Sequence, residues 1–154
     1  MRAFALFLFS CAFLIPYSAS AAALPRAAEM QASENLPPII LAGLQAYKAG
    51  GPDNAIAAWV RGSALDGNKD VLSEANMLHS IQGFYGAYHT FDLIGSRQLG
   101  ARTRVYYLTL DFDKGPVFGK FIVYKTEQAW ILVAFNFNTK DDVLPSNLPV
   151  TTLP

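Results

Sequence analysis

Histidine, aspartate and tyrosine side chains near the middle of the chain are the ones best suited to acid–base chemistry. His89 lies three residues before Asp92, and Tyr85 lies four residues before His89. A histidine oriented by a carboxylate, with a tyrosine nearby, can move a proton at neutral pH. Residues three apart in a regular strand point to opposite faces, however, so we expect His89 and Asp92 to diverge. These three residues are candidates only, and a structural histidine is the preferred interpretation.

Two further carboxylates, Asp111 and Asp113, flank Phe112 just before Lys114-Gly115. Paired carboxylates can bind a hard cation or share a proton. The same residue types also form tight turns, and a turn is the interpretation that we prefer. Two histidines, with no cysteine beyond Cys11, do not make a zinc site. No nucleophile elbow or phosphate-binding loop occurs either, so the sequence predicts neither a metal nor a cofactor.

The N-terminus has the anatomy of a secretory signal peptide. Arg2 precedes an apolar run over residues 3–15, and small residues including Ala19-Ser20-Ala21 follow it. The run is shorter than the roughly 20 residues that a membrane-spanning helix needs. We therefore expect cleavage after Ala21, or after one of the two alanines that follow, and export to the periplasm or medium. Cys11 would leave with the signal, so the exported chain would have no disulfide and no membrane span.

Charge and length limit the classes of partner and the number of domains. Twelve basic and twelve acidic residues balance, without a run of either sign. Nucleic acids and anionic membranes are bound through concentrated basic surfaces, so we expect neither partner. About 130 residues remain after cleavage, enough for one core. We divide the chain into a signal peptide (1–21), a flexible leader (22–35), one domain (36–140) and an extended, Pro-rich tail (141–154).

Hydrophobic periodicity predicts helices first and strands afterwards. Apolar residues recur with helical spacing in three segments between residues 37 and 82. Strand-like alternation follows over 87–138, with Gly95 marking a bulge. Asp113–Pro116 and Lys125–Gln128 are turn sequences that close the last two hairpins. We expect an α+β fold, with about three N-terminal helices packed on a curved four-stranded antiparallel sheet.

The three strands between Arg102 and Asn138 are apolar on both faces. Strict alternation in the last strand places Val133 beside Phe135, with Leu132 on the opposite face. A sheet with one solvated face would show a polar side, so both faces should meet something. We expect helices on one face, and a second copy of the chain or a small apolar ligand on the other. A monomer whose tail covers that face is the alternative. The residues that we assign to the ligand or partner surface are Arg104, Tyr106, Tyr107, Phe121, Tyr124 and Trp130.

Several short segments resemble a group of small exported bacterial proteins. They are Tyr47-Lys48-Ala49-Gly50 leading to Trp59, Tyr85-Gly86, Asp113-Lys114-Gly115-Pro116, Tyr124, Trp130, Phe135-Asn136-Phe137-Asn138-Thr139 and Leu144-Pro145. That group is similar in fold to the nuclear-transport-factor-like superfamily, which is related in layout to cystatins. The likeness covers about 36–145, and it implies a cone-like sheet and pairing of subunits through their sheets. Ketosteroid isomerases share the superfamily fold, but fold alone does not carry function over.

Two functions from different classes follow from the sequence. It favours an exported, non-catalytic domain that binds a small apolar ligand or a protein partner through its aromatic sheet face. The alternative is a small isomerase or dehydratase with Tyr85, His89, Asp92 or Tyr106 in a pocket. The enzyme hypothesis requires that at least two of those side chains converge inside one cavity.

Overall fold

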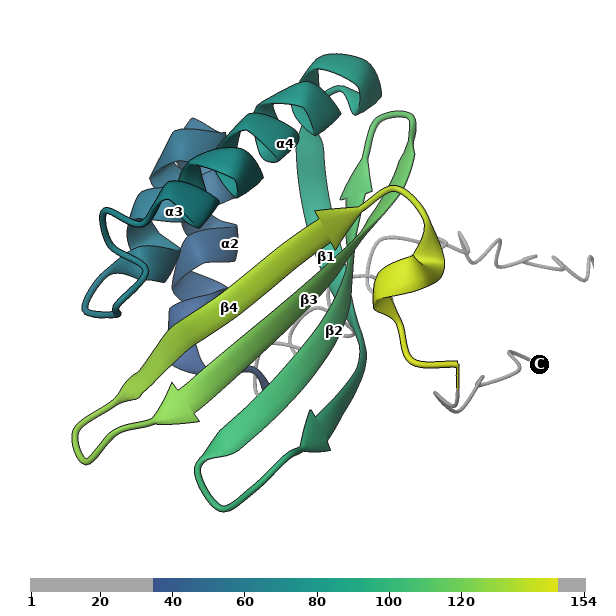
Figure 1. Ribbon diagram of the computed structural model, residues 1–154. Coiled ribbons are helices and arrows are strands. Elements are labelled where there is room, and N and C mark those ends of the chain that lie inside the picture. Colours follow the sequence, from purple (N-terminus) through teal and green to yellow (C-terminus); the bar gives the residue numbers. More distant parts are fainter. Residues whose placement is uncertain (1–34, 147–154) are drawn as a thin grey trace, which may run out of the picture.

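The fold consists of helices followed by a sheet in the computed structural model, which describes residues 35–146 (Figure 1). The helices are α2 (Pro38–Gly50), α3 (Pro52–Val60) and α4 (Lys69–Tyr85). The strands are β1 (Tyr88–Gln98), β2 (Thr103–Phe112), β3 (Gly115–Lys125) and β4 (Trp130–Asn138). A 3-10 helix, η1 (Asp141–Val143), begins the segment predicted as an extended tail. The α+β class is confirmed. The predicted signal peptide and nearly all of the predicted leader lie outside the described residues.

Proline, glycine and asparagine set the ends of the helices. Pro38 and Pro52 occupy first turns, where a missing N–H breaks no helical hydrogen bond. Gly51 separates α2 from α3 with a φ of 82°, which glycine adopts without a Cβ clash. The side chain of Asn68 caps α4, because its oxygen accepts the N–H of Asp70 at 2.9 Å. Local sequence signals therefore define all three helices.

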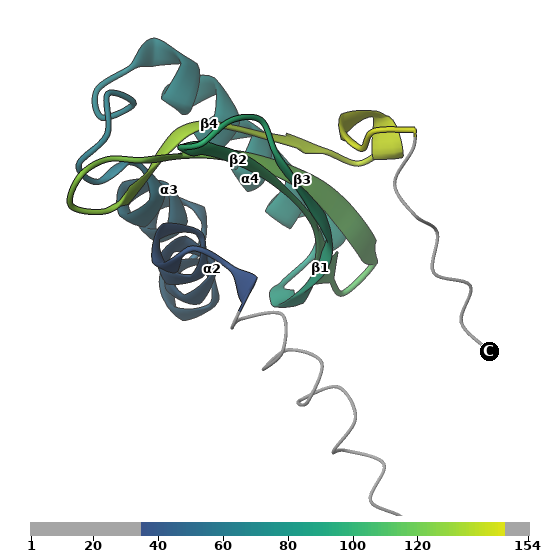
Figure 2. The same cartoon turned by 90° about the horizontal axis from the view of Figure 1, so that it is seen from below.

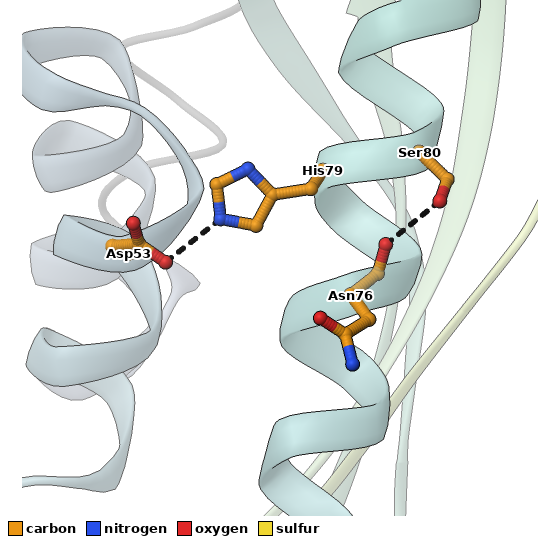
Figure 3. Close-up of polar contacts among 4 residues, drawn as sticks. All are labelled: Asp53, Asn76, His79 and Ser80. Atoms are coloured by element: carbon orange, nitrogen blue, oxygen red, sulfur yellow. Dashed lines mark hydrogen bonds and ion pairs between the residues drawn. The ribbon is translucent and has the colours of Figure 1, made fainter.

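The second histidine links two of these helices at the surface. Nε2 of His79 on α4 lies 2.8 Å from Oδ1 of Asp53, in the first turn of α3 (Figure 3). In the same turn of α4, the hydroxyl of Ser80, the residue after His79, donates to the carbonyl of Asn76 at 2.9 Å (Figure 3). The side chains of His79 and Asp53 are 51% and 78% exposed, so this contact is a surface link.

Each strand pairs with the next one in the chain, which gives an antiparallel meander. A two-residue loop, Asp113-Lys114, joins β2 to β3, and Gly115 follows it with a φ of 146°. The loop from Thr126 to Ala129 joins β3 to β4, one residue later than predicted. The hydroxyl of Thr126 accepts the N–H of Ala129 at 2.9 Å and closes this loop.

The helices lie together on one side of the sheet, and the core fills the space between the two layers (Figures 1 and 2). Trp59 of α3 is fully buried at its centre. The rings of Phe121, Phe135 and Phe137 lie 5.2, 5.8 and 5.6 Å from the ring of Trp59, centroid to centroid. Tilted contacts at these distances are favourable for aromatic rings. This cluster fixes α3 on β3 and β4.

The predicted alternation in β4 is wrong at Val133. Ile122 pairs with Ala134 and Val123 pairs with Leu132, so Val133 is an extra residue in the strand. Such a bulge exchanges the faces of the residues before it. Leu132 is accordingly fully buried beneath the helices, whereas Val133 is 40% exposed. In β1 the register also slips between Leu93 and Gly95, where the sequence predicted a bulge.

Candidate functional site

A second irregularity in β1 brings His89 next to Asp113. The register of β1 against β2 slips between Tyr88 and Thr90, so His89 is the extra residue. Its Nε2 lies 2.5 Å from Oδ1 of Asp113. The other oxygen of Asp113 accepts the N–H of Ala87 at 2.7 Å. These two bonds, first the backbone one and then that of His89, lower the pKa of Asp113.

Asp92 and Asp111 belong to the same surface cluster as His89. Asp92 lies directly opposite Thr109, two residues from Asp111 on β2, so both carboxylates share one face of the sheet. Burial and the charge of Asp92 raise the pKa of Asp111, and the charge of His89 lowers it. The extra residue at His89 also means that the regular alternation, from which His89 and Asp92 were expected to point apart, does not hold between them.

This cluster is open to solvent. The side chains of His89 and Asp113 are 56% and 49% exposed. Tyr85 is half-buried, and its carbonyl accepts the N–H of Lys114 at 3.0 Å, which ties the end of α4 to the β2–β3 turn. Within residues 35–146, no three ligating side chains are arranged to hold a metal ion. The arrangement can exchange protons with water, but it does not enclose a substrate.

The structure separates the residues that the sequence assigned to one aromatic surface. Tyr106 and Phe121 are 3% and 0% exposed, and they lie in the core beneath the helices. They are therefore not on an accessible surface. Tyr107 is on the face turned away from the helices, yet only 2% of it is exposed. Tyr124 lies on the same outer face and is 36% exposed. The remaining two residues, Arg104 and Trp130, come together at one end of the sheet.

Trp130 is in contact with two cations at the start of β4. The guanidinium carbon of Arg104 lies 5.1 Å from the ring centroid of Trp130, and Nζ of Lys125 lies 5.7 Å from it. Lys125 is paired directly with Trp130 across the β3–β4 hairpin. Among the described residues, no carboxylate lies within ion-pair distance of Arg104 or Lys125. The indole ring thus holds two positive charges that have no protein counter-ion in that part of the chain.

A groove of about 630 Å³ opens beside Trp130. Its walls are Ile39 of α2, Arg61-Gly62 after α3, and the hairpin residues Thr126 to Ile131. The lining thus combines aliphatic and aromatic side chains with two opposite charges, the guanidinium of Arg61 and the carboxylate of Glu127. Apolar walls with a few polar groups are typical of sites for amphipathic ligands. A second hollow on the outer face, between β3 and β4, has a volume of only about 90 Å³.

The end of the sheet that carries Trp130 is basic, and the opposite end is acidic. The β1–β2 and β3–β4 loops lie at the same end (Figure 1), where the N–H of Lys125 donates to the carbonyl of Arg102 at 2.8 Å. The residues that we call the basic tip are Arg61, Arg97, Arg102, Arg104 and Lys125. The β2–β3 turn and the end of β4 carry four acids, Asp111, Asp113, Asp141 and Asp142, and two lysines, Lys114 and Lys140. Sequence reasoning missed this polarity because no run of like charges marks it.

None of the helices in the described part of the chain has the length and apolar character needed to cross a bilayer. The chain matches no protein-family model, no curated protein and no solved structure.

Proposed function

We propose that this chain is a binding domain that holds a small amphipathic ligand with an anionic group in the groove beside Trp130. The observation that carries the proposal is the Trp130 ring in the groove wall, which has Arg61 beside it and two further cations, Arg104 and Lys125, against its faces. Within residues 35–146 none of these cations has a carboxylate partner. An anionic group placed there forms charge-assisted hydrogen bonds. The apolar part of the ligand packs against Ile39 and the indole ring. The volume of about 630 Å³ suits a ligand of a few hundred daltons.

As the sequence predicts, binding is non-catalytic and uses aromatic side chains, but the proposed site lies at the end of the sheet beside Trp130 and not on a sheet face. We also propose, from the sequence, that the domain is exported and that its sheet is cone-like, as in the nuclear-transport-factor-like superfamily. The helix-then-meander order supports the second of these proposals. A homodimer through the outer sheet face is also proposed, supported by two exposed apolar side chains on neighbouring strands, Tyr124 and Val133. Light scattering tests it: Val133→Asp should halve the mass, and a monomeric unsubstituted chain contradicts it.

Two fluorescent probes that differ in charge test the groove. 1-Anilinonaphthalene-8-sulfonate is anionic, and N-phenyl-1-naphthylamine is its uncharged counterpart. For the chain from Ala22 onward, which keeps every described element, Arg61→Gln should weaken binding of the anionic probe roughly tenfold, because a charge-assisted bond is lost. Binding of the uncharged probe should not change, whereas Trp130→Leu should weaken both.

Lys48→Gln is the matched control, because it removes one exposed charge outside the groove lining. It should leave both dissociation constants within twofold of the unsubstituted chain. If Arg61→Gln and Trp130→Leu bind both probes as tightly as Lys48→Gln does, the groove is not the site.

A further inference from the structure

The basic tip carries exposed apolar side chains among its cations. Leu99, in the loop between β1 and β2, is 52% exposed, and its neighbours in the chain include Arg97 and Arg102. Tyr124, at the end of β3, is 36% exposed and pairs with Thr103 across the sheet. Aromatic and aliphatic side chains beside arginine and lysine are characteristic of surfaces that enter the headgroup region of a bilayer.

Charge is concentrated at this tip although the whole chain is neutral. The segments 97–104 and 124–131 contain four basic residues and one acidic residue, Glu127. Arg61 adds a fifth positive charge beside them. Within the described part of the chain, none of these five cations is in an ion pair. Because four acidic residues, Asp111, Asp113, Asp141 and Asp142, lie at the far end of the sheet, an anionic surface would attract the tip and repel the opposite end.

We propose that the basic tip docks on an anionic phospholipid surface, with Leu99 and Tyr124 in the headgroup layer. Charge complementarity selects an anionic partner, and the exposed apolar side chains favour a lipid over a purely polar polyanion. The signal-peptide pattern predicts export of the domain across a membrane. The basic tip shares Arg61, Arg104 and Lys125 with the proposed ligand site. The test of docking therefore uses Arg97, Leu99 and Arg102, which do not line the groove.

Vesicle flotation with the chain from Ala22 onward tests this docking. Vesicles of phosphatidylcholine and phosphatidylglycerol at 3:1 should bind the protein at low salt, and pure phosphatidylcholine should not. Each cation removed should weaken binding about fivefold, so Arg97→Gln with Arg102→Gln should weaken it about 25-fold. Binding should also fall steeply between 50 and 200 mM salt, since the interaction is screened.

The matched control removes two lysines from the opposite end, Lys114→Gln with Lys140→Gln, and gives the same change in net charge. It should bind anionic vesicles at least as tightly as the unsubstituted chain. Equal losses in the two double variants, or no binding to anionic vesicles at 50 mM salt, would overturn the proposal.

Leu99→Ser distinguishes a lipid surface from other polyanions. It should weaken vesicle binding several-fold and leave binding to heparin unchanged, because only the bilayer offers an apolar layer. The lipid proposal is wrong if Leu99→Ser binds anionic vesicles as tightly as the unsubstituted chain and heparin, at the same concentration of negative charge as the vesicles, displaces the protein from them. The tip would then be a site for polyanions in general.

Discussion

The indole Nε1 of Trp59 donates a hydrogen bond to the carbonyl oxygen of Ile40, 3.0 Å away and fully inside the protein. This bond joins α3 to α2 at the point where the Trp59 ring also meets the aromatic side chains of β3 and β4. A buried donor and a buried acceptor therefore satisfy each other between two helices. The position of the two helices on the sheet depends on how closely their backbones approach at this bond.

Gly43 makes that approach possible, and we predict that Gly43→Ala is destabilising. An ideal Cβ at residue 43 would lie 1.9 Å from Nε1 of Trp59, so the indole or the helix has to move. The cost should be at least about 2 kcal/mol in the free energy of unfolding. Urea denaturation measures it. Gly83→Ala on α4 is the matched control, because nothing lies within 4 Å of its Cβ position. That variant should gain about 0.5–1 kcal/mol from helix propensity. Equal effects at residues 43 and 83 would contradict the packing argument.

The hydroxyl of Tyr47 is buried and has no hydrogen-bond partner among the described residues. Its ring stacks on Tyr88 at 4.9 Å, and burial raises its pKa. Because Phe keeps the ring and removes the unsatisfied hydroxyl, Tyr47→Phe should raise the free energy of unfolding by about 1 kcal/mol. The comparison is Tyr124→Phe at an exposed position, which should leave stability unchanged. A loss of stability in Tyr47→Phe would show that the hydroxyl is satisfied in solution.

Glu74 of α4 reaches the edge strand β4, where its Oε1 accepts a hydrogen bond from Nδ2 of Asn136 at 3.1 Å. Burial raises its pKa, and the bonds from Asn136 and the backbone of Phe137 lower it by less. A raised pKa means that the folded state holds this proton more tightly than the unfolded state. Glu74 therefore contributes its full stabilisation at a pH below its pKa in the unfolded chain. That contribution is lost as the pH rises through its pKa in the folded protein.

From this sign we predict that Glu74→Gln becomes more stable, relative to the unsubstituted chain, as the pH rises from 4 to 7. Gln keeps an acceptor for Asn136 without a buried charge. Urea midpoints at several pH values measure the difference, with Glu127→Gln on an exposed loop as the control. A difference independent of pH would mean that Glu74 is not desolvated.

Asp113 shows the opposite pH dependence. Its pKa is lowered by the N–H of Ala87 and by His89, so its contribution is present above the ordinary carboxyl pKa and lost as pH falls through the lowered one. Asp113→Asn should therefore lower the thermal midpoint at pH 7, and the loss should shrink as the pH approaches 3. Lys140→Gln, which is not among the groups that shift the pKa of Asp113, should show no such pH dependence. A loss equally large at pH 3 and pH 7 would assign the effect of Asp113→Asn to turn geometry alone.

The helices and the meander could be predicted from sequence because their signals are local. Proline at a first turn, glycine between helices and an Asp-Lys-Gly turn act on residues within a few positions of themselves. The same locality explains why the strand faces of β2 and β3 followed the alternation of their residues. The predicted fold class and the order of elements needed no knowledge of distant contacts.

Only the tertiary structure decided where the candidate site lies. An extra residue at Val133 reversed the faces that alternation assigned in β4, and another at His89 broke the alternation in β1, because a bulge is set by the partner strand. Tyr106 and Phe121 went into the core because the helices cover their face of the sheet. The basic tip consists of charges that are up to 64 positions apart, from Arg61 to Lys125, and a balanced composition conceals them. The sequence gives the position of each charge along the chain, whereas the electrostatic field depends on the distances between charges in space, which are set by the fold.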